Sequence, residues 1–213
     1  MKSLLFKEFY LSAHPTAYIF TALGVLVLVP NYPYGVIFLF GGLASMITFS
    51  YGRETNDAAF SALLPVSRRR IVGGRLAFVC LAQVCQLLLS LPFAFLRTRI
   101  FPDGNAAGIE ANAAFYGFAM FAYALYNLVF FAEFYKTGHR VGVSFLKAVL
   151  PIVLVIVCME TCAHIPALAF FDGVSAHDLL LQTPLFAFGA AAYVICNVFA
   201  YRIASARFAR IDL

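Results

Sequence analysis

Six apolar stretches, separated by short polar or charged ones, follow one another along the chain. A membrane-spanning helix needs about 20 predominantly apolar residues, and most of these stretches approach that length. The pattern therefore predicts an all-α, polytopic membrane protein with six transmembrane helices in a single domain, residues 1–213. The expected spans are 16–29, 34–51, 76–96, 113–132, 148–161 and 183–201.

Two further segments are expected at the membrane surface. Residues 1–12 mix apolar side chains with charged ones such as Lys7 and Glu8, which is typical of an amphipathic helix lying in the interface. The fifth apolar stretch becomes polar at Glu160. We therefore interpret residues 162–181 as an outer segment of short re-entrant helices between spans five and six.

The composition supports a membrane protein and changes the interpretation of the charge. Hydrophobic residues make up 63% of the 213 residues and charged residues only 12%, whereas a soluble domain has about 25% charged residues. The net charge of +5 does not predict a nucleic-acid partner, because basic residues beside apolar spans orient a protein in the bilayer. The five cysteines all lie in apolar stretches, which indicates packing rather than a metal site.

The distribution of basic residues predicts the orientation. Four alternate segments hold 13 of the 15 Lys and Arg residues, and only Arg97 and Arg99 fall on the other side. By the positive-inside rule the four segments, and with them both termini, are expected in the cytoplasm. The four segments are 1–15, 52–75, 133–147 and 202–213.

Segment 52–75 is the long polar and basic interruption between spans two and three. It is expected outside the hydrocarbon core, because each charge placed inside that core would cost about 2.5–3.5 kcal/mol. Asn56 or Asp57 is predicted to cap a short helix, and Pro65 is predicted to end it. Such a helix, followed by a proline break and the arginines that start at Arg68, offers a surface that another protein can bind.

Several chemistries are excluded by missing motifs. The sequence contains no Gly-x-x-x-x-Gly-Lys-[Ser/Thr] phosphate loop, no His-Glu-x-x-His zinc site and no Gly-x-Ser-x-Gly nucleophile turn. Glu160 and His164 are four residues apart and share one helix face, so they are a candidate outer polar site for a proton or a metal. The alternative is that both are hydrated groups near the outer interface.

A polar stripe on the third span is a candidate lining of a transport path. Gln83, Gln86 and Ser90 follow one another at helical spacing, and Tyr123 and Asn127 lie near one face of the aromatic fourth span. The same side chains can instead hold helices together by hydrogen bonds. The sequence leaves both interpretations open.

Segment 52–75 resembles the small permeases of the ABC-2 type, the membrane subunits of bacterial ABC exporters. The opening residues resemble the amphipathic entry helix of that family, so the similarity covers essentially the whole chain. The residues that carry it are Met1 to Tyr10, Asn56-Asp57, Leu64-Pro65-Val66-Ser67-Arg68, Ile71-Val72 and Arg75.

The resemblance implies a multi-pass subunit in the bacterial cytoplasmic membrane, with segment 52–75 docking as a coupling helix on a separate ATPase subunit. That subunit would bind ATP and Mg, while this chain would hold no cofactor and no metal and would not be an enzyme by itself. A second permease copy, identical or a sister chain, would complete the path. The residues expected at the ATPase contact are Glu54, Asn56, Asp57, Phe60, Leu63, Leu64, Pro65 and Arg68.

Two other functions stay open at this point. The first is an ion- or proton-coupled membrane transporter, or a membrane enzyme, that uses Glu160 and His164. The second is an immunity or sensor subunit that binds a peptide without moving it. For the exporter, the expected substrate is a peptide or an amphipathic small molecule.

Overall fold

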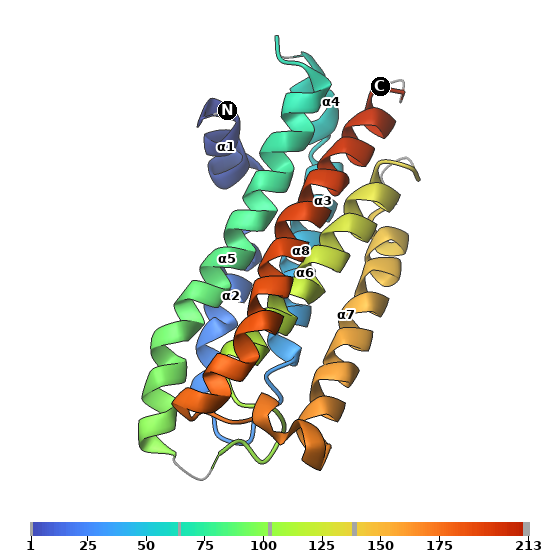
Figure 1. Cartoon of the computed structure of the whole chain (residues 1–213). Coiled ribbons are helices and arrows are strands. Elements are labelled where there is room, and N and C mark those ends of the chain that lie inside the picture. The colour runs from blue at the N-terminus through green and yellow to red at the C-terminus, as the bar shows by residue number, and fades with distance from the viewer. Residues whose placement is uncertain (1, 64, 102–103, 138–139, 211–213) are drawn as a thin grey trace.

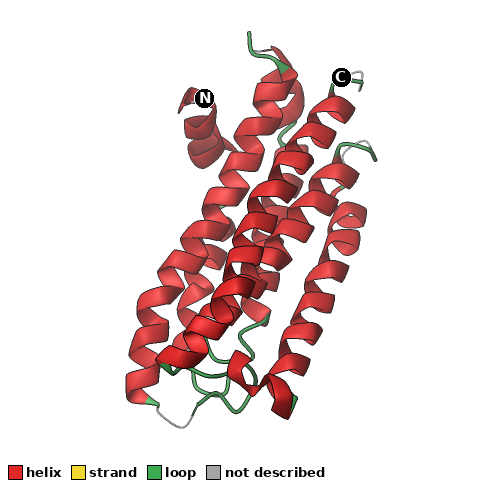
Figure 2. Ribbon diagram, in the orientation of Figure 1, coloured by secondary structure: helices red, strands yellow, loops and turns green. Residues whose placement is uncertain are grey.

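The computed structural model describes residues 2–63, 65–101, 104–137 and 140–210 (Figure 1). Within these ranges the chain consists of helices and loops and has no β-strand (Figure 2). The predicted all-α fold is therefore confirmed. The helices are α1 (Lys2–Lys7), η1 (Glu8–Ser12), α2 (Pro15–Ala22), η2 (Leu23–Leu28), α3 (Val36–Glu54), α4 (Asp57–Leu63), α5 (Arg68–Ile100), α6 (Ala113–Phe134), α7 (Val141–His164), η3 (Pro166–Phe171) and α8 (Ala176–Phe208).

Five of the described helices, namely α3, α5, α6, α7 and α8, are long and apolar enough to cross a membrane. The first predicted span corresponds to α2 and η2, which are too short on their own. Together with the helical stretch Ser3–Ser12 they form a pair bent by 94°, and counting that pair as one span gives six. Both counts describe a polytopic membrane protein, as the apolar pattern predicts.

Three of the long helices extend beyond their predicted spans. The helices α5, α7 and α8 begin seven or eight residues before the starts of the predicted spans, so each helix is longer than the span predicted within it. Hydropathy marks only the part of a helix that suits hydrocarbon, whereas backbone hydrogen bonding continues until a cap or a breaker ends it. Ser175 caps α8 by accepting a hydrogen bond from the backbone N–H of Asp178, which leaves Pro184 inside the helix.

The outer segment between spans five and six is partly helical. Residues 162–164 belong to the last turn of α7, and the 3₁₀ helix η3 follows. The first turns of α8 complete residues 162–181. A short helix therefore lies between the two spans, while its re-entrant character stays a prediction.

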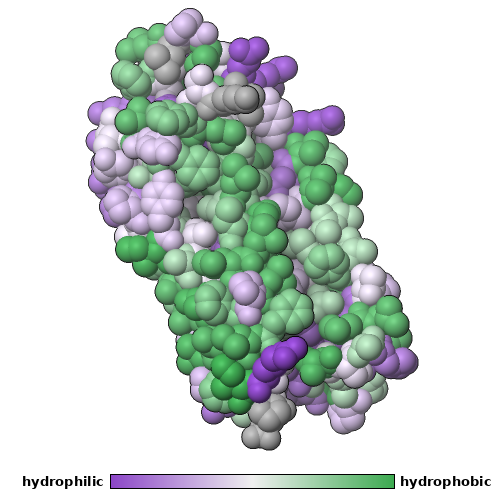
Figure 3. All heavy atoms as spheres, turned by 90° about the vertical axis from the view of Figure 1, so that its left-hand side faces the viewer, coloured by the Kyte–Doolittle hydropathy of each residue, from purple (hydrophilic) through white to green (hydrophobic). Residues whose placement is uncertain are grey.

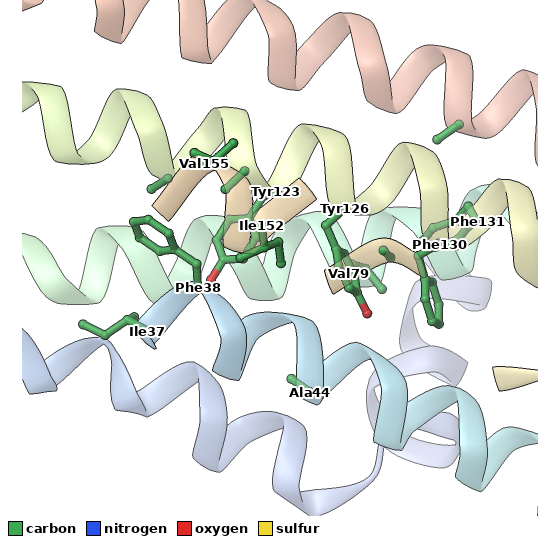
Figure 4. Close-up of a cluster of buried hydrophobic side chains, with 14 of the residues drawn as sticks. Ile37, Phe38, Ala44, Val79, Tyr123, Tyr126, Phe130, Phe131, Ile152 and Val155 are labelled. Atoms are coloured by element: carbon green, nitrogen blue, oxygen red, sulfur yellow. The ribbon is translucent and has the colours of Figure 1, made fainter. Parts of the chain in front are cut away.

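The helix α6 is the centre of the bundle. In its most apolar window 72% of the residues are buried, compared with 11% in α8 and 28% in α7. It packs against α3, α7 and α8. Tyr123 and Tyr126 reach from α6 into the buried cluster that includes Phe38 of α3 (Figure 4), and the Tyr126 hydroxyl donates to the carbonyl of Gly42 over 2.8 Å. The aromatic residues of the predicted fourth span thus form the core.

The helices α6 and α8 approach each other closely at Gly117 and Gly189. A β-carbon on Gly189 would overlap the carbonyl oxygen of Gly117, which is backbone and cannot rotate away. Small residues allow such close crossings in membrane proteins. We expect Gly189→Ala to force the two helices apart and to cost about 1–3 kcal/mol, as overpacking does. The melting temperature of the purified protein measures this loss.

Gly142 provides a matched control for that substitution. A β-carbon at Gly142 would meet no atom within 4 Å. Gly142→Ala should therefore leave the melting temperature unchanged or raise it slightly. Equal melting temperatures for the two alanine variants would contradict the close contact between α6 and α8.

The ends of the bundle differ in composition from its middle. The helices α1 and α4 and the C-terminal end of α8 lie at one end, and η3 lies at the other (Figure 1). On the face drawn in Figure 3, hydrophobic residues form the middle band and strongly hydrophilic ones gather mainly toward the ends. This separation suits a chain that crosses a bilayer, while the side that faces the cytoplasm stays a prediction.

Candidate functional site

The helix α4 is a short helix held between two long ones at one end of the bundle. Asn56 turns the chain out of α3. Its φ of +52° lies in the left-handed region, which Asn tolerates better than most residues. The helix then runs from Asp57 to Leu63 and ends before Pro65. The short helix and the proline break that the sequence predicts are therefore both present.

One face of α4 is fastened to the rest of the chain. The Lys7 ammonium contacts Asp57 with 2.8 Å between Nζ and Oδ1, and it donates to the Ser61 hydroxyl over 2.7 Å. The Ser12 hydroxyl donates to Asp57 over 3.1 Å. Asp57, expected at the ATPase contact, is thus turned inward toward the N-terminal helices, and its role with a partner stays a prediction.

An adjacent face of α4 is apolar and open. Phe60 is 58% exposed and Leu63 is 86% exposed, although both are large hydrophobic side chains. Glu54, Asn56 and Pro65 are exposed around them. Leu64 lies outside the described residues, so its predicted role has no structural counterpart here.

Beneath α4 lies a group of four charged side chains, which we call the charged cluster: Lys7, Glu8, Asp57 and Arg75. Arg75 donates from Nε to Glu8 Oε2 over 3.1 Å and also pairs with Asp57. Lys7 pairs with Glu8 over 3.0 Å. The side chains of Glu8 and Arg75 are 1% and 6% exposed, so two positive and two negative charges balance each other away from water.

Neighbouring residues make room for the Arg75 guanidinium. It lies over the ring of Phe49, with 5.0 Å between the guanidinium carbon and the ring centre. A β-carbon at Gly52 would come within 2.9 Å of a guanidinium nitrogen, so the absence of a side chain there creates the space. A cavity of about 130 Å³ adjoins this site and separates part of α4 from the bundle.

The charged cluster gives the protein a specific dependence on acid. Burial alone would raise the pKa of Asp57, but Arg75 and Lys7 outweigh it and hold this pKa below its usual range. The ion pairs of Asp57 therefore stabilise the fold above about pH 4 and are lost as the pH falls further. We expect Asp57→Asn to lower the melting temperature at pH 7, and the difference from the unchanged protein to shrink below about pH 4. A difference that is constant with pH would contradict the charged role of Asp57.

Arg68 connects the start of α5 to the end of α8. Its guanidinium donates from Nη1 to the backbone carbonyl of Phe208 over 3.1 Å and lies 5.7 Å from the centre of the Phe208 ring. Arg68 was expected at the ATPase contact. In the structure it holds two long helices together, and its contact with an ATPase stays a prediction.

The polar side chains predicted as path lining meet inside the chain. Gln83 and Asn127 exchange two hydrogen bonds of 2.9 and 2.8 Å, which join α5 to α6. Gln86 donates to the carbonyl of Phe20 over 2.7 Å and accepts from the Tyr123 hydroxyl.

Ser90 also joins α5 to α6, because its hydroxyl lies 2.9 Å from that of Tyr116 on α6. All five predicted residues are buried, and their partners come from α2, α5, α6 and α8. Within this chain they hold helices together. Their exposure to a path between two permease copies stays a prediction.

At the other end of the bundle, Glu160 holds a loop in place. Its Oε2 accepts a hydrogen bond of 3.1 Å from the backbone N–H of Ile109. His164 is exposed, and its ring nitrogen lies 2.7 Å from the backbone carbonyl of Glu160. The described residues contain no group of three or more potential metal ligands. A role of this pair in proton or ion coupling stays a prediction.

A buried ion pair that the sequence analysis missed lies beside that loop. Arg97 donates to both carboxylate oxygens of Glu110, over 2.8 and 3.1 Å, and to the carbonyl of Gly104. Burial raises the pKa of Glu110 despite the opposing charge of Arg97, and nearby Asp172 adds to the rise. This pair closes the loop between α5 and α6.

The charged cluster was missed for a similar reason. Lys7, Glu8 and Arg75 were assigned to the interface and to orientation, since charges beside apolar spans need no other explanation. One feature of the sequence indicates such a cluster: charges of both signs lie in the N-terminal helix, and Arg75 directly precedes the third predicted span. Nothing in the sequence indicates that Ser12 and Ser61 contact this cluster.

Five or six apolar spans around a central α6 define a multi-pass membrane protein, and an exposed short helix lies at one end of the bundle. The sequence profile described as ABC-2 family transporter protein matches residues 3–205. The chain therefore belongs to the ABC-2 family of transporter proteins, as the resemblance in segment 52–75 predicts.

This membership makes the chain a transmembrane subunit of an ABC transporter, not a catalytic enzyme in itself. Members of the family usually work with an ATPase subunit, and the family fits a chain without a cofactor of its own. Neither a curated protein nor a solved structure was found to match the chain.

Proposed function

We propose that this chain is the membrane subunit of an ATP-driven bacterial exporter and that α4 is the helix on which a separate ATPase subunit docks. The observation that carries the proposal is the exposed pair Phe60 and Leu63 on a helix whose other face is fastened by Asp57 and Ser61. Large apolar side chains at the polar end of a membrane protein favour contact with another protein.

The charged cluster supports a route from α4 into the membrane. Asp57 joins α4 to Lys7 of α1 and to Arg75 of α5 at the same time. A displacement of α4 therefore has to move α1 and α5 with it or break buried ion pairs, which is costly. The cavity beside the cluster leaves space for such a displacement.

The charge distribution and the family support the remaining parts of the proposal. The end that carries α4 faces the cytoplasm of a bacterium, where ATP is available, because basic residues gather in the segments at that end. ATP and Mg bind to the ATPase subunit. Two permease copies, identical or paired as sister chains, surround the path, and the substrate is a peptide or an amphipathic small molecule.

Gentle purification of the intact chain from its own membrane tests the proposal. We expect an ATPase with a phosphate-binding loop to remain bound and to hydrolyse ATP in the complex. A chain that never retains such a subunit, and that moves substrate without nucleotide after reconstitution, would overturn the assignment and favour the ion-coupled alternative.

A further inference from the structure

A groove of about 380 Å³ runs between α5 and α8 near the end of the bundle that carries α4. The two helices lie side by side there (Figure 1). Arg69 and Arg70 line its outer end, and Gly73 and Tyr201 line its wall. Because α5 and α8 are both spanning helices, the groove opens toward the lipid rather than toward bulk water.

The inner part of the groove offers no unsatisfied polar group. Asn197 accepts from the Cys80 thiol over 3.2 Å and from Asn127 over 3.0 Å, and it donates to the carbonyl of Tyr193 over 2.7 Å. The other walls are carbon, as at Leu76, Ala77 and Val198. An occupant of this part therefore needs only an apolar chain.

The outer end of the groove has the opposite character. Arg69 and Arg70 are exposed, and among the described residues neither side chain has a hydrogen-bond or ion-pair partner. The first turn of α5 contains no acidic residue to balance them. Several other basic side chains at this end do have partners, namely Lys7 and Arg75 in the charged cluster, Lys147 on Glu133, and Arg207 on the carbonyl of Ala132.

We propose that the groove binds one anionic phospholipid from the leaflet at the α4 end, with its phosphate between Arg69 and Arg70 and one acyl chain along Gly73 toward Asn197. Positive charge at the membrane surface and an apolar channel directly below it match the two halves of such a molecule. The proposal requires only that the chain spans a bilayer, so it is independent of the ATPase contact.

Gly73 determines the shape of the groove. A β-carbon there would lie 3.3 Å from the ring of Tyr201, so glycine lets the ring stand beside α5 without filling the groove. Ala77 lies one turn further along and is partly exposed. A larger side chain at this position would occupy the space of the acyl chain while leaving every charge in place.

Native mass spectrometry of the intact chain, titrated in detergent with phosphatidylglycerol or with phosphatidylcholine of the same chain length, tests the site. We expect one phosphatidylglycerol to bind in preference to phosphatidylcholine. Arg69→Gln combined with Arg70→Gln should weaken this binding by about 10-fold or more, since each basic residue near the surface contributes to attraction of anionic lipid. Ala77→Leu should weaken the binding of both lipids.

The double variant Arg140→Gln with Arg210→Gln is the matched control. It removes the same charge from exposed positions that do not line the groove. Unchanged binding in this control supports a defined site. An equal loss in the control, full binding by Ala77→Leu, or a tightly held peptide in place of lipid would overturn the proposal. Unchanged melting temperatures in the four preparations verify that folding is not the cause.

Discussion

The variant Leu63→Asp is expected to lose the ATPase subunit and all ATP hydrolysis that depends on it, while the chain stays folded in the membrane. Leu63 is 86% exposed and makes up much of the open apolar face of α4, so its replacement costs the isolated chain little. In a complex the new carboxylate would be buried against apolar groups, which costs several kcal/mol for an unpaired charge. Co-purification of the ATPase and ATP hydrolysis by the complex measure the loss.

Ala106→Asp is the matched control, because it adds the same charge at an exposed position at the other end of the bundle. It should retain the ATPase. Phe60→Ser, which removes the second apolar side chain of the face, should weaken the complex without adding charge. Normal transport by Leu63→Asp would show that α4 is not the docking helix.

The variant Arg75→Met is expected to lower the melting temperature of the purified protein by roughly 6–20 °C. The substitution leaves Glu8 and Asp57 together at a buried site with only Lys7 to balance them. Removing one partner from a buried ion pair costs about 3–5 kcal/mol, because the remaining charge has lost both water and its counter-ion.

A second substitution separates charge from packing in this experiment. Glu8→Gln added to Arg75→Met leaves Lys7 and Asp57 as a balanced pair, so part of the lost melting temperature should return. The comparison needs no assay of transport. A double variant no more stable than Arg75→Met would mean that the contact of Arg75 with Phe49, rather than its charge, supports the fold.

Features that depend on residues close together in the sequence could be predicted. The all-α class follows from the apolar stretches, and the short helix between spans two and three follows from Asn56, Asp57 and Pro65. Those local signals also carried the resemblance to the ABC-2 family. The starts of α5 and α8 could not be placed, since hydropathy does not report where a helix continues beyond the hydrocarbon.

The charged cluster depends on contacts between residues far apart in the chain. Its members at positions 7, 57 and 75 come together only because the N-terminal helices bend by 94° before α2 and because α4 folds back over α5. No short stretch of sequence predicts the bend or the position of α4. The same holds for Gln83 and Asn127, whose pairing across two helices decides what the polar stripe does within the chain.

The length of α5 and α8 has a consequence for the height at which α4 stands. Each contains 33 residues and is therefore about 50 Å long, whereas the hydrocarbon core of a bilayer is about 30 Å thick. Tilting takes up part of this excess, and the remainder of each helix lies beyond the hydrocarbon, in the headgroup layer. These helix ends hold α4 at the outer edge of the headgroup layer, where a soluble subunit can contact it without displacing lipid.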